Sequence, residues 1–353
     1  MQARLLVGRT PWSAAGPPAC LRPEADEGVG RGPGVRPTIL KLAACFYVFG
    51  SVAFAAPSQP IYSLAWRPDG AMIALGGYKE TRLVDPTSRK PIATLTGHAE
   101  AVRALAFSRD GKRLAAAGGL PARKGEVKIW DVTAETVAGT ITGHSDCIHA
   151  VAFSPDGAIL ATASYDKLIK LWDVATAKEI RTLRDHIDAI YALAFTADGK
   201  RLVSGAADRS VKIWDVETGA RLYTLSDATD GINTIALSPD GTRVAAGGLD
   251  KTIRIWRLGE KEGTLENTLI AHEDAILKLA WSPDGKYLAS ASADHTIRLF
   301  RAAGLTAVRA IASQPDWAFG LEFAPNGKSF AAGLFNGLLE IYEVDHEKAL
   351  ASK

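Results

Sequence analysis

The side chains best suited to metal chemistry lie in one short segment, His144-Ser145-Asp146-Cys147-Ile148-His149. Imidazole, thiolate and carboxylate groups at this close spacing are ligands that zinc or copper accepts. A cysteine thiol also packs well as a small apolar side chain, which offers a structural explanation for Cys147. We therefore predict neither a metal nor any other cofactor in this segment.

A carboxylate recurs at regular intervals before and after this segment. The acidic residues concerned are Glu100, Asp146, Asp188, Asp230, Asp274 and Asp316. If the fold placed them in a ring, they could together bind cations. Short acidic side chains in loops more often accept hydrogen bonds from nearby backbone N–H groups. We favour this structural role for them.

Catalytic motifs are missing from the sequence. It contains no glycine-rich phosphate loop, no nucleophile elbow, no paired-cysteine metal motif and no Cys-x-x-Cys-His haem motif. We therefore predict that the protein is not an enzyme and assign no catalytic residue.

The elements that must position these side chains are repeated along the chain. Seven tight turns, each ending in Asp-Gly or Asn-Gly, follow apolar segments. The third residues of these turns are Asp69, Asp110, Asp156, Asp198, Asp240, Asp284 and Asn326. Successive turns lie 41 to 46 residues apart. A period in the low forties with strand-turn-strand content is typical of a propeller blade.

One unit illustrates the pattern. Residues 148–153 are apolar and β-branched, as expected of a strand, and Ser154-Pro155-Asp156-Gly157 follows as a hairpin turn. Residues 160–164, 168–172 and 179–183 predict three further strands. Because the inner strands are apolar on both faces, each sheet must pack between two others. This favours an all-β, seven-bladed propeller of four-stranded antiparallel blades.

The repeats resemble the WD-repeat β-propeller family. Trp-Asp ends the third strand of three units, and Gly-His opens two units. The family's blades carry a hydrogen-bonded tetrad of His, Ser or Thr, Asp and Trp. Two sets in this sequence match it: His144, Thr162, Asp166 and Trp172, and then His186, Ser204, Asp208 and Trp214. A third set ends in Phe300 instead of Trp, and a fifth unit has Ala228 and Ala246 where His and Ser or Thr belong.

The resemblance also implies a binding surface, because in this family the start of each inner strand faces the mouth of the central channel. In blade order these residues are Tyr62, Arg103, His149, Tyr191, Asn233, Leu277 and Phe319. Aromatic residues and arginine are enriched at binding hot spots. The same side chains could instead only plug the channel. The second unit adds a longer segment, residues 118–126, in which Arg123 and Lys124 are predicted to lie on the same face.

We predict from these features a non-catalytic scaffold that binds a protein or peptide across the channel mouth. The alternative is a propeller that binds a small molecule or metal, as an accessory to an exported redox system. Some exported bacterial WD-repeat proteins that this chain resembles are fused to, or encoded beside, haem-binding modules. We expect a monomeric propeller that acts within a complex.

The charge balance disfavours nucleic acid as a partner. The chain carries 41 basic and 39 acidic residues, and six of the basic and three of the acidic residues precede residue 56. The repeats are therefore close to neutral, and they contain no basic stripe of the kind that neutralises phosphates.

The first 55 residues differ from the repeats. Residues 1–34 are rich in Gly, Pro and Arg and are predicted to be disordered or to reflect a mis-assigned start, with translation beginning at Val35. Residues 35–55 have basic residues, an apolar run and Ala53-Phe54-Ala55, which is the pattern of a signal peptide. Cleavage would leave 56–353 as the propeller, without a membrane span, in the periplasm or secreted. The alternative is a cytoplasmic protein.

Export would also affect how the ring closes. Cleavage after Ala55 would leave few residues before the first inner strand. We therefore expect the last blade to use residues 349–352 as its own outer strand, and a soft seam between the last blade and the first.

Overall fold

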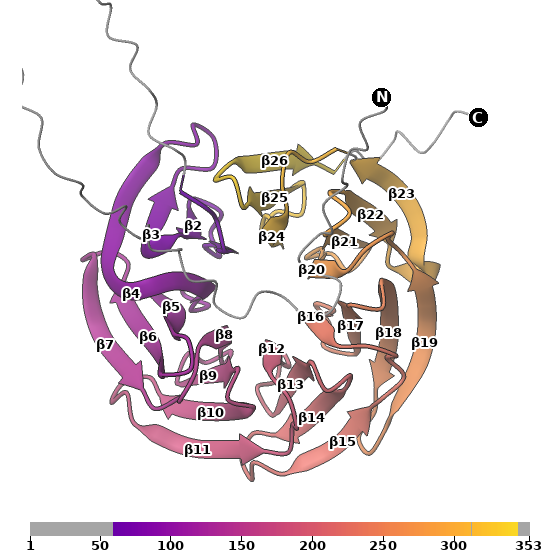
Figure 1. Ribbon diagram of the computed structural model, residues 1–353, viewed down its shortest axis with the longest axis horizontal. Coiled ribbons are helices and arrows are strands. Elements are labelled where there is room, and N and C mark those ends of the chain that lie inside the picture. The colour runs from indigo at the N-terminus through magenta and orange to yellow at the C-terminus, as the bar shows by residue number, and fades with distance from the viewer. Residues whose placement is uncertain (1–58, 312, 345–353) are drawn as a thin grey trace, which may run out of the picture.

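The computed structural model describes residues 59–311 and 313–344, which are built almost entirely of β-strands (Figure 1). The strands of the first half are β1 (Ser63–Trp66), β2 (Ile73–Gly76), β3 (Tyr78–Val84), β4 (Pro91–Phe107), β5 (Arg113–Leu120), β6 (Lys124–Asp131), β7 (Thr136–Thr142), β8 (Ile148–Phe153), β9 (Ile159–Ser164), β10 (Leu168–Asp173), β11 (Glu179–Arg184), β12 (Ile190–Phe195) and β13 (Arg201–Ala206). Those of the second half are β14 (Val211–Asp215), β15 (Arg221–Leu225), β16 (Ile232–Leu237), β17 (Arg243–Gly248), β18 (Thr252–Leu258), β19 (Gly263–Ile270), β20 (Ile276–Trp281), β21 (Tyr287–Ser292), β22 (Ile297–Arg301), β23 (Thr306–Ile311), β24 (Ala318–Phe323), β25 (Ser329–Leu334) and β26 (Leu339–Glu343). A 3-10 turn, η1 (Ala303–Leu305), precedes β23.

The strands form antiparallel sheets in which each strand pairs with the next along the chain. Four sheets have four strands each, the last has three (β24-β25-β26), and the first joins seven strands. The long strand β4 causes this fusion, since Thr96 pairs with Glu80 of β3 and Val102 pairs with Gly118 of β5. It is thus the outer strand of one sheet and the inner strand of the next. The predicted fold class, all-β with repeated four-stranded antiparallel sheets, is confirmed.

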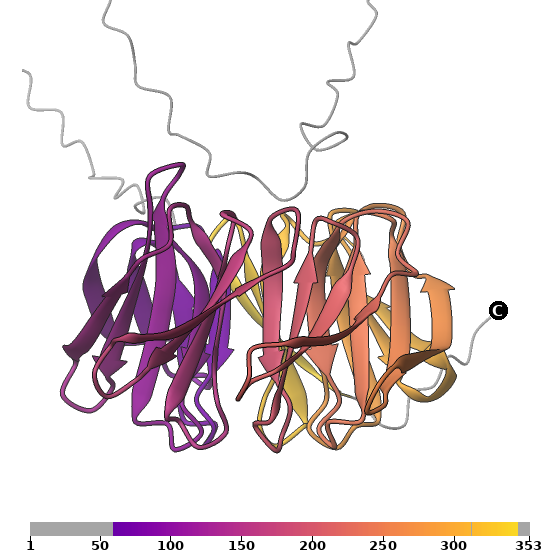
Figure 2. The same ribbon diagram turned by 90° about the horizontal axis from the view of Figure 1, so that it is seen from below.

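The sheets stand side by side around a central opening. The inner strands β1, β4, β8, β12, β16, β20 and β24 contact one another in this order, and β24 contacts β1, so the described residues close a ring (Figure 1). Seen from the side, the connecting loops gather at two opposite faces of the ring (Figure 2). The described residues include no helix that is long and apolar enough to span a membrane.

The recurring turns are stabilised by their own side chains. In the turn after β8, Ser154 Oγ donates to Asp156 Oδ1 at 2.5 Å, and the same oxygen accepts the Ala158 N–H at 3.0 Å. Gly157 has a φ of +72°, which is readily available only to glycine. Its N–H donates to the carbonyl oxygen of Ser154 at 2.8 Å and closes the turn. The chain therefore reverses at the same point in each repeat.

The core lies between neighbouring sheets. One cluster joins Ala115, Val127 and Ile129 of one sheet to Val151 and Trp172 of the next. Strand β21 is buried at all of its positions, as a strand packed on both faces must be. The large side chains Trp214, Trp256, Phe300 and Phe330 are fully buried between sheets.

Contacts between β1 and the last sheet close the ring. The Ile61 N–H donates to the carbonyl oxygen of Leu334 at 3.2 Å, and the Trp66 N–H donates to Glu322 Oε2 at 2.8 Å. The predicted disordered segment (1–34), the predicted signal peptide (35–55) and the predicted outer strand (349–352) lie outside the described residues. These three remain predictions.

Candidate functional site

The residues predicted at the channel mouth lie at irregularities of the inner strands. Six of the seven inner strands contain a register shift against their neighbour. The residues at these shifts are Arg103, His149, Tyr191, Asn233, Leu277 and Phe319. The seventh residue, Tyr62, directly precedes β1. A β-bulge gives one strand an extra residue and re-aims its side chain. The bulges therefore explain why these side chains leave the sheet surface at the channel.

Four aromatic rings form a row on one side of the channel mouth. Phe335 lies between Tyr62 and Phe319, with ring centroids 5.8 Å from each, and Trp317 lies 6.3 Å beyond Phe319. Neighbouring rings meet edge to face, the geometry that aromatic quadrupoles favour. All four side chains are partly exposed. Trp317 and Phe335 were not predicted, because neither lies at the repeat position that singled out the others.

A second aromatic group lies on β8, β12 and the turn after β9. The His149 ring lies 5.2 Å from Tyr191 and 6.1 Å from Tyr165, and the two tyrosine rings are 6.4 Å apart. On β4, between the two groups, the Arg103 guanidinium lies 5.7 Å from the Tyr62 ring centroid. We call these side chains the aromatic rim: Tyr62, Tyr165, Tyr191, Trp317, Phe319 and Phe335, with Arg103.

Three of the predicted residues contribute little surface. Asn233, Leu277 and Tyr191 are 6%, 8% and 8% exposed. The Asn233 Nδ2 donates to the carbonyl oxygen of Ile276 at 2.9 Å and so ties β16 to β20. The bulges at Asn233 and Leu277 therefore serve packing between sheets, and we leave both residues out of the aromatic rim. We keep Tyr191 in it because its ring packs against His149 and Tyr165.

The longer segment of the second unit is mostly strand. Within residues 118–126, Gly119 pairs with Gly125 and Leu120 pairs with Lys124, so β5 and β6 extend into a longer hairpin. The Ala122 N–H donates to Asp146 Oδ1 at 2.9 Å, which holds the hairpin tip beside the start of β8. Arg123 and Lys124 are exposed at this tip. Their charges are therefore presented on the face where β8 begins, and Lys124 Nζ lies 3.7 Å from Glu126 Oε2.

A cavity of about 150 Å³ lies in the channel between the inner strands. Its polar lining includes Arg103, His149, Tyr191 and Lys278. Burial, together with the charges of Arg103 and Lys278, lowers the pKa of His149 to about 3. The imidazole is therefore neutral near pH 7. Burial also lowers the pKa of Arg103 and of Lys278, so the lining disfavours their positive charges unless an anion lies close to them.

Comparison with known families identifies the repeats. A family model described as WD domain, G-beta repeat, matches residues 89–131, 135–173, 177–215, 219–257 and 263–301, which together exceed half of the chain. The chain belongs to the WD-repeat family. Each match begins in or near an outer strand and ends at the third strand of the next sheet. WD-repeat propellers are scaffolds that commonly mediate protein interactions and are typically non-catalytic. A search for similar curated proteins gave no match.

The residues that resemble the WD-repeat tetrad form hydrogen-bonded chains. His186 Nδ1 lies 2.7 Å from Asp208 Oδ2, its Nε2 lies 2.7 Å from Ser204 Oγ, and Trp214 Nε1 donates to the same hydroxyl at 2.8 Å. Burial raises the pKa of Asp208, but the hydrogen bond and charge of His186 and the hydrogen bonds from Ser210 and the Ile187 N–H together outweigh it, and the resulting pKa is about 2. The corresponding set is connected in the same way: His144, Thr162, Asp166 and Trp172.

Two other WD-repeat units depart from this arrangement. His272 bonds Asp294 and Ser290 at 2.9 and 2.6 Å, and Phe300 has no group that could donate to the serine. In the unit with Ala228 and Ala246, Trp256 Nε1 instead donates to Asp227 Oδ2 at 2.8 Å. The sequence did not predict this hydrogen bond from Trp256 to Asp227, because Asp227 does not occupy a tetrad position.

The recurring carboxylates are engaged by their own loops. In five of the six, a side-chain oxygen accepts the N–H of the following residue at 2.7 to 2.8 Å. The residues are Asp146, Asp188, Asp230, Asp274 and Asp316. This geometry fits the structural role. Residues 59–311 and 313–344 contain no group of three or more His, Cys, Asp or Glu side chains that could hold a metal ion.

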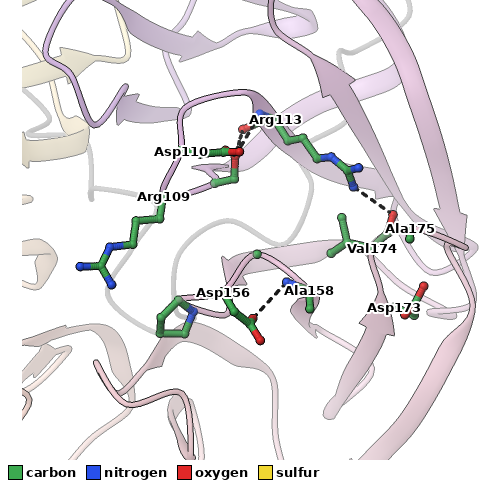
Figure 3. Close-up of a pocket in the computed structure, with 11 residues that line it drawn as sticks. Arg109, Asp110, Arg113, Asp156, Ala158, Asp173, Val174 and Ala175 are labelled. Atoms are coloured by element: carbon green, nitrogen blue, oxygen red, sulfur yellow. Dashed lines mark hydrogen bonds between the residues drawn. The ribbon is translucent and has the colours of Figure 1, made fainter.

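A larger hollow, of about 600 Å³, lies at the opposite end of the inner strands, between the turns that follow β4 and β8 (Figure 3). Its polar groups are already used within the fold. Asp110 and Asp156 each accept a serine hydroxyl and a backbone N–H of their own turn, and Arg113 Nη1 donates to the carbonyl oxygen of Val174 at 3.4 Å. Arg109 extends away from these groups (Figure 3). The hollow is therefore explained by turn structure, and we base no function on it.

Proposed function

We propose that this protein is a non-catalytic scaffold that binds a protein or peptide across the aromatic rim. The observation that carries the proposal is the rim itself, a continuous row of partly exposed aromatic rings beside Arg103. Large aromatic side chains and arginine supply most of the binding energy at protein interfaces. If the rings served only to plug the channel, packing against the inner strands would leave little of them exposed.

The proposal includes the arrangement of the whole propeller. With β4 divided between two sheets, the strands of the described residues group into seven units, and we propose that these are seven blades of one monomeric propeller. The hairpin tip with Arg123 and Lys124 adds charge on the face where β8 begins. A partner that covers the rim would therefore contact strands from several blades at once, which suits an extended segment of chain.

Site-specific crosslinking followed by substitution tests the proposal. A photoreactive amino acid in place of Phe319 would capture the partner, and the identified partner would then be titrated against purified wild-type and variant proteins. We expect Phe319→Ala and Tyr62→Ala each to weaken binding by at least about tenfold, as hot-spot residues do. Ile180→Ala, which removes a 48% exposed side chain from the outer strand β11, is the control and keeps full affinity. Unchanged affinity in both rim variants would show that the partner binds elsewhere.

We also propose that the protein is exported to the periplasm or medium. The support is the pattern of residues 35–55, in which basic residues, an apolar run and Ala53-Phe54-Ala55 follow one another. Intact-mass measurement of the protein from fractionated cells tests this. A form that begins at Ala56 in the envelope or medium is expected, whereas a cytosolic form that retains 39–55 would contradict export.

A further inference from the structure

The channel cavity contains more hydrogen-bond donors than acceptors. Its polar lining comes from inner strands that are far apart in the sequence: Arg103 from β4, His149 from β8, Tyr191 from β12 and Lys278 from β20. Two hydroxyls in the lining are already engaged. Ser63 Oγ donates to the carbonyl oxygen of Val102 at 2.9 Å. Thr234 Oγ1 accepts the N–H of Leu279 at 3.1 Å.

The cationic groups have no counter-charge at bonding distance. Within the described residues, no hydrogen bond or ion pair within 4.0 Å is formed by the Arg103 guanidinium or the Lys278 ammonium. Glu322 acts electrostatically on Lys278, and Glu100 acts on Arg103, but neither carboxylate is close enough to pair. The guanidinium lies 5.7 Å from the centroid of the Tyr62 ring. Removing such charges from water without a partner is unfavourable.

His149 adds an unused polar atom to the same lining. Its Nε2 is buried and has no hydrogen-bond partner in the part of the chain that the structure describes. It is one of twelve such side-chain atoms among the described residues, and His149 is the one residue of these that lines the channel cavity. With the proton of the neutral imidazole on Nε2, a ligand that brings acceptor oxygens and negative charge would therefore satisfy Arg103, Lys278 and His149 together.

The size of the cavity restricts the ligand. A volume of 150 Å³ holds about five water molecules at roughly 30 Å³ each. It is smaller than the roughly 300–1,000 Å³ pockets that hold drug-sized molecules. A carboxylate is small enough, has acceptor sites for several donors, and pairs with arginine through two parallel hydrogen bonds.

We propose that the channel is a carboxylate-binding site in which Arg103 and Lys278 bind the side-chain carboxylate of an acidic residue and His149 Nε2 completes its hydrogen bonds. The acidic residue belongs to the segment held on the aromatic rim, and this assignment of the source rests on the proposed function. The partner is therefore an extended segment that places Asp or Glu over the channel and apolar side chains on the surrounding rings.

Histidine NMR of the full-length protein tests the site directly. The chain has seven histidines, and His149→Asn identifies the His149 ring signals. The probes are sodium acetate, the blocked peptide acetyl-Gly-Glu-Gly-amide and its Gln counterpart, each titrated at constant ionic strength. We expect the His149 signals to shift and saturate with acetate and with the Glu peptide, and to stay unchanged with the Gln peptide.

Substitutions then assign the binding groups. Arg103→Gln and Lys278→Met each remove one positive charge at nearly constant size, and each should raise the midpoint of the titration at least about tenfold, as loss of a charge-assisted hydrogen bond does. Arg109→Gln on the opposite face is the control and should leave the midpoint unchanged. Thermal unfolding of each variant confirms that it is folded, and either variant alone suffices if the other does not fold.

Each possible result of these titrations either supports or overturns the carboxylate site. Binding that both variants retain, or no shift of His149 up to tens of millimolar of any probe, would overturn the site. Binding of acetate without the Glu peptide would overturn the assignment to a partner's side chain and indicate a free small carboxylate. Binding of the Glu peptide alone would support the partner assignment. The two proposals can also be separated. Loss of carboxylate binding in Arg103→Gln would support the carboxylate site, whereas unchanged partner affinity in Phe319→Ala and Tyr62→Ala would contradict the proposed function.

Discussion

Replacing Glu322 with glutamine should make the protein more stable at neutral and alkaline pH. Glu322 lies on β24 at the closure of the ring, where its Oε2 accepts the Trp66 N–H at 2.8 Å. Burial raises the pKa of Glu322 from 4.5 to about 7, although the Trp66 hydrogen bond and the charge of Lys278 act in the opposite direction. The folded protein therefore favours the protonated, neutral form of this side chain.

The size of the effect follows from linkage between protonation and folding. Between pH 4.5 and about 7 the folded state binds the Glu322 proton more tightly than the unfolded state does, so this group lowers the free energy of unfolding as pH rises. The two pKa values correspond to a loss on the order of 3 kcal/mol that is complete above about pH 7. Glu322→Gln stays neutral and still offers an oxygen to the Trp66 N–H.

Urea unfolding followed by tryptophan fluorescence, from about pH 4.5 to 8.5, measures the difference between Glu322→Gln and wild type. The variant should match wild type at the acid end and exceed it by up to about 3 kcal/mol above neutrality. Because His98 and His149, whose pKa values are lowered, oppose this trend in both proteins, only the difference between proteins is informative. Glu262→Gln removes an exposed charge from the turn after β18 and should show no such difference. A Glu322→Gln effect that does not vary with pH would refute the reasoning.

Three further predictions concern the polar groups between the sheets. Ser204→Ala leaves two buried polar groups without their partner, the Trp214 Nε1–H and His186 Nε2, whereas Ser290→Ala leaves one, His272 Nε2; urea unfolding should therefore show that the first variant loses about 1–3 kcal/mol more, and equal losses would contradict this. Trp256→Phe should lower the free energy of unfolding by about 1 kcal/mol or more, because it removes the hydrogen bond to Asp227 and leaves a gap; an unchanged urea midpoint would contradict it. Folding lowers the pKa of Asp208 to about 2, so its carboxylate stabilises the fold above pH 3.8 and loses this effect as pH falls toward 2. During acid titration followed by circular dichroism, the stability of wild type should therefore approach that of Asp208→Asn. A difference in stability that stays constant with pH would argue against it.

The strands and turns could be predicted because they depend on short-range chemistry. The Asp-Gly turns are stabilised by side chains within the turn, as at Asp156, and the alternation of turns with apolar runs defines the strands. The offsets between His186, Ser204 and Asp208 likewise follow from strand pairing within one sheet. Each of these features lies within a single repeat, so its sequence signal is local.

Much of the candidate site could not be predicted because it arises between repeats. Tyr165 and Phe335 join the rim only because the bulges and the curvature of the ring bring them beside Tyr191 and Phe319. Asn233 occupies an equivalent repeat position, yet its amide is used to bind the next sheet. Equivalent positions in the sequence therefore did not have equivalent exposure.

The sequence by itself determined the repeated all-β architecture, because turn chemistry and strand patterning act over a few residues. Only the tertiary structure decided which side chains share the channel. Arg103 and Lys278 are 175 positions apart, and closure of the ring places both in the lining of one cavity, where neither forms an ion pair with a carboxylate of residues 59–311 or 313–344. This imbalance of charge is a property of the folded ring. Electrostatic interactions depend on distances in space and on burial, and the spacing of residues along the chain determines neither.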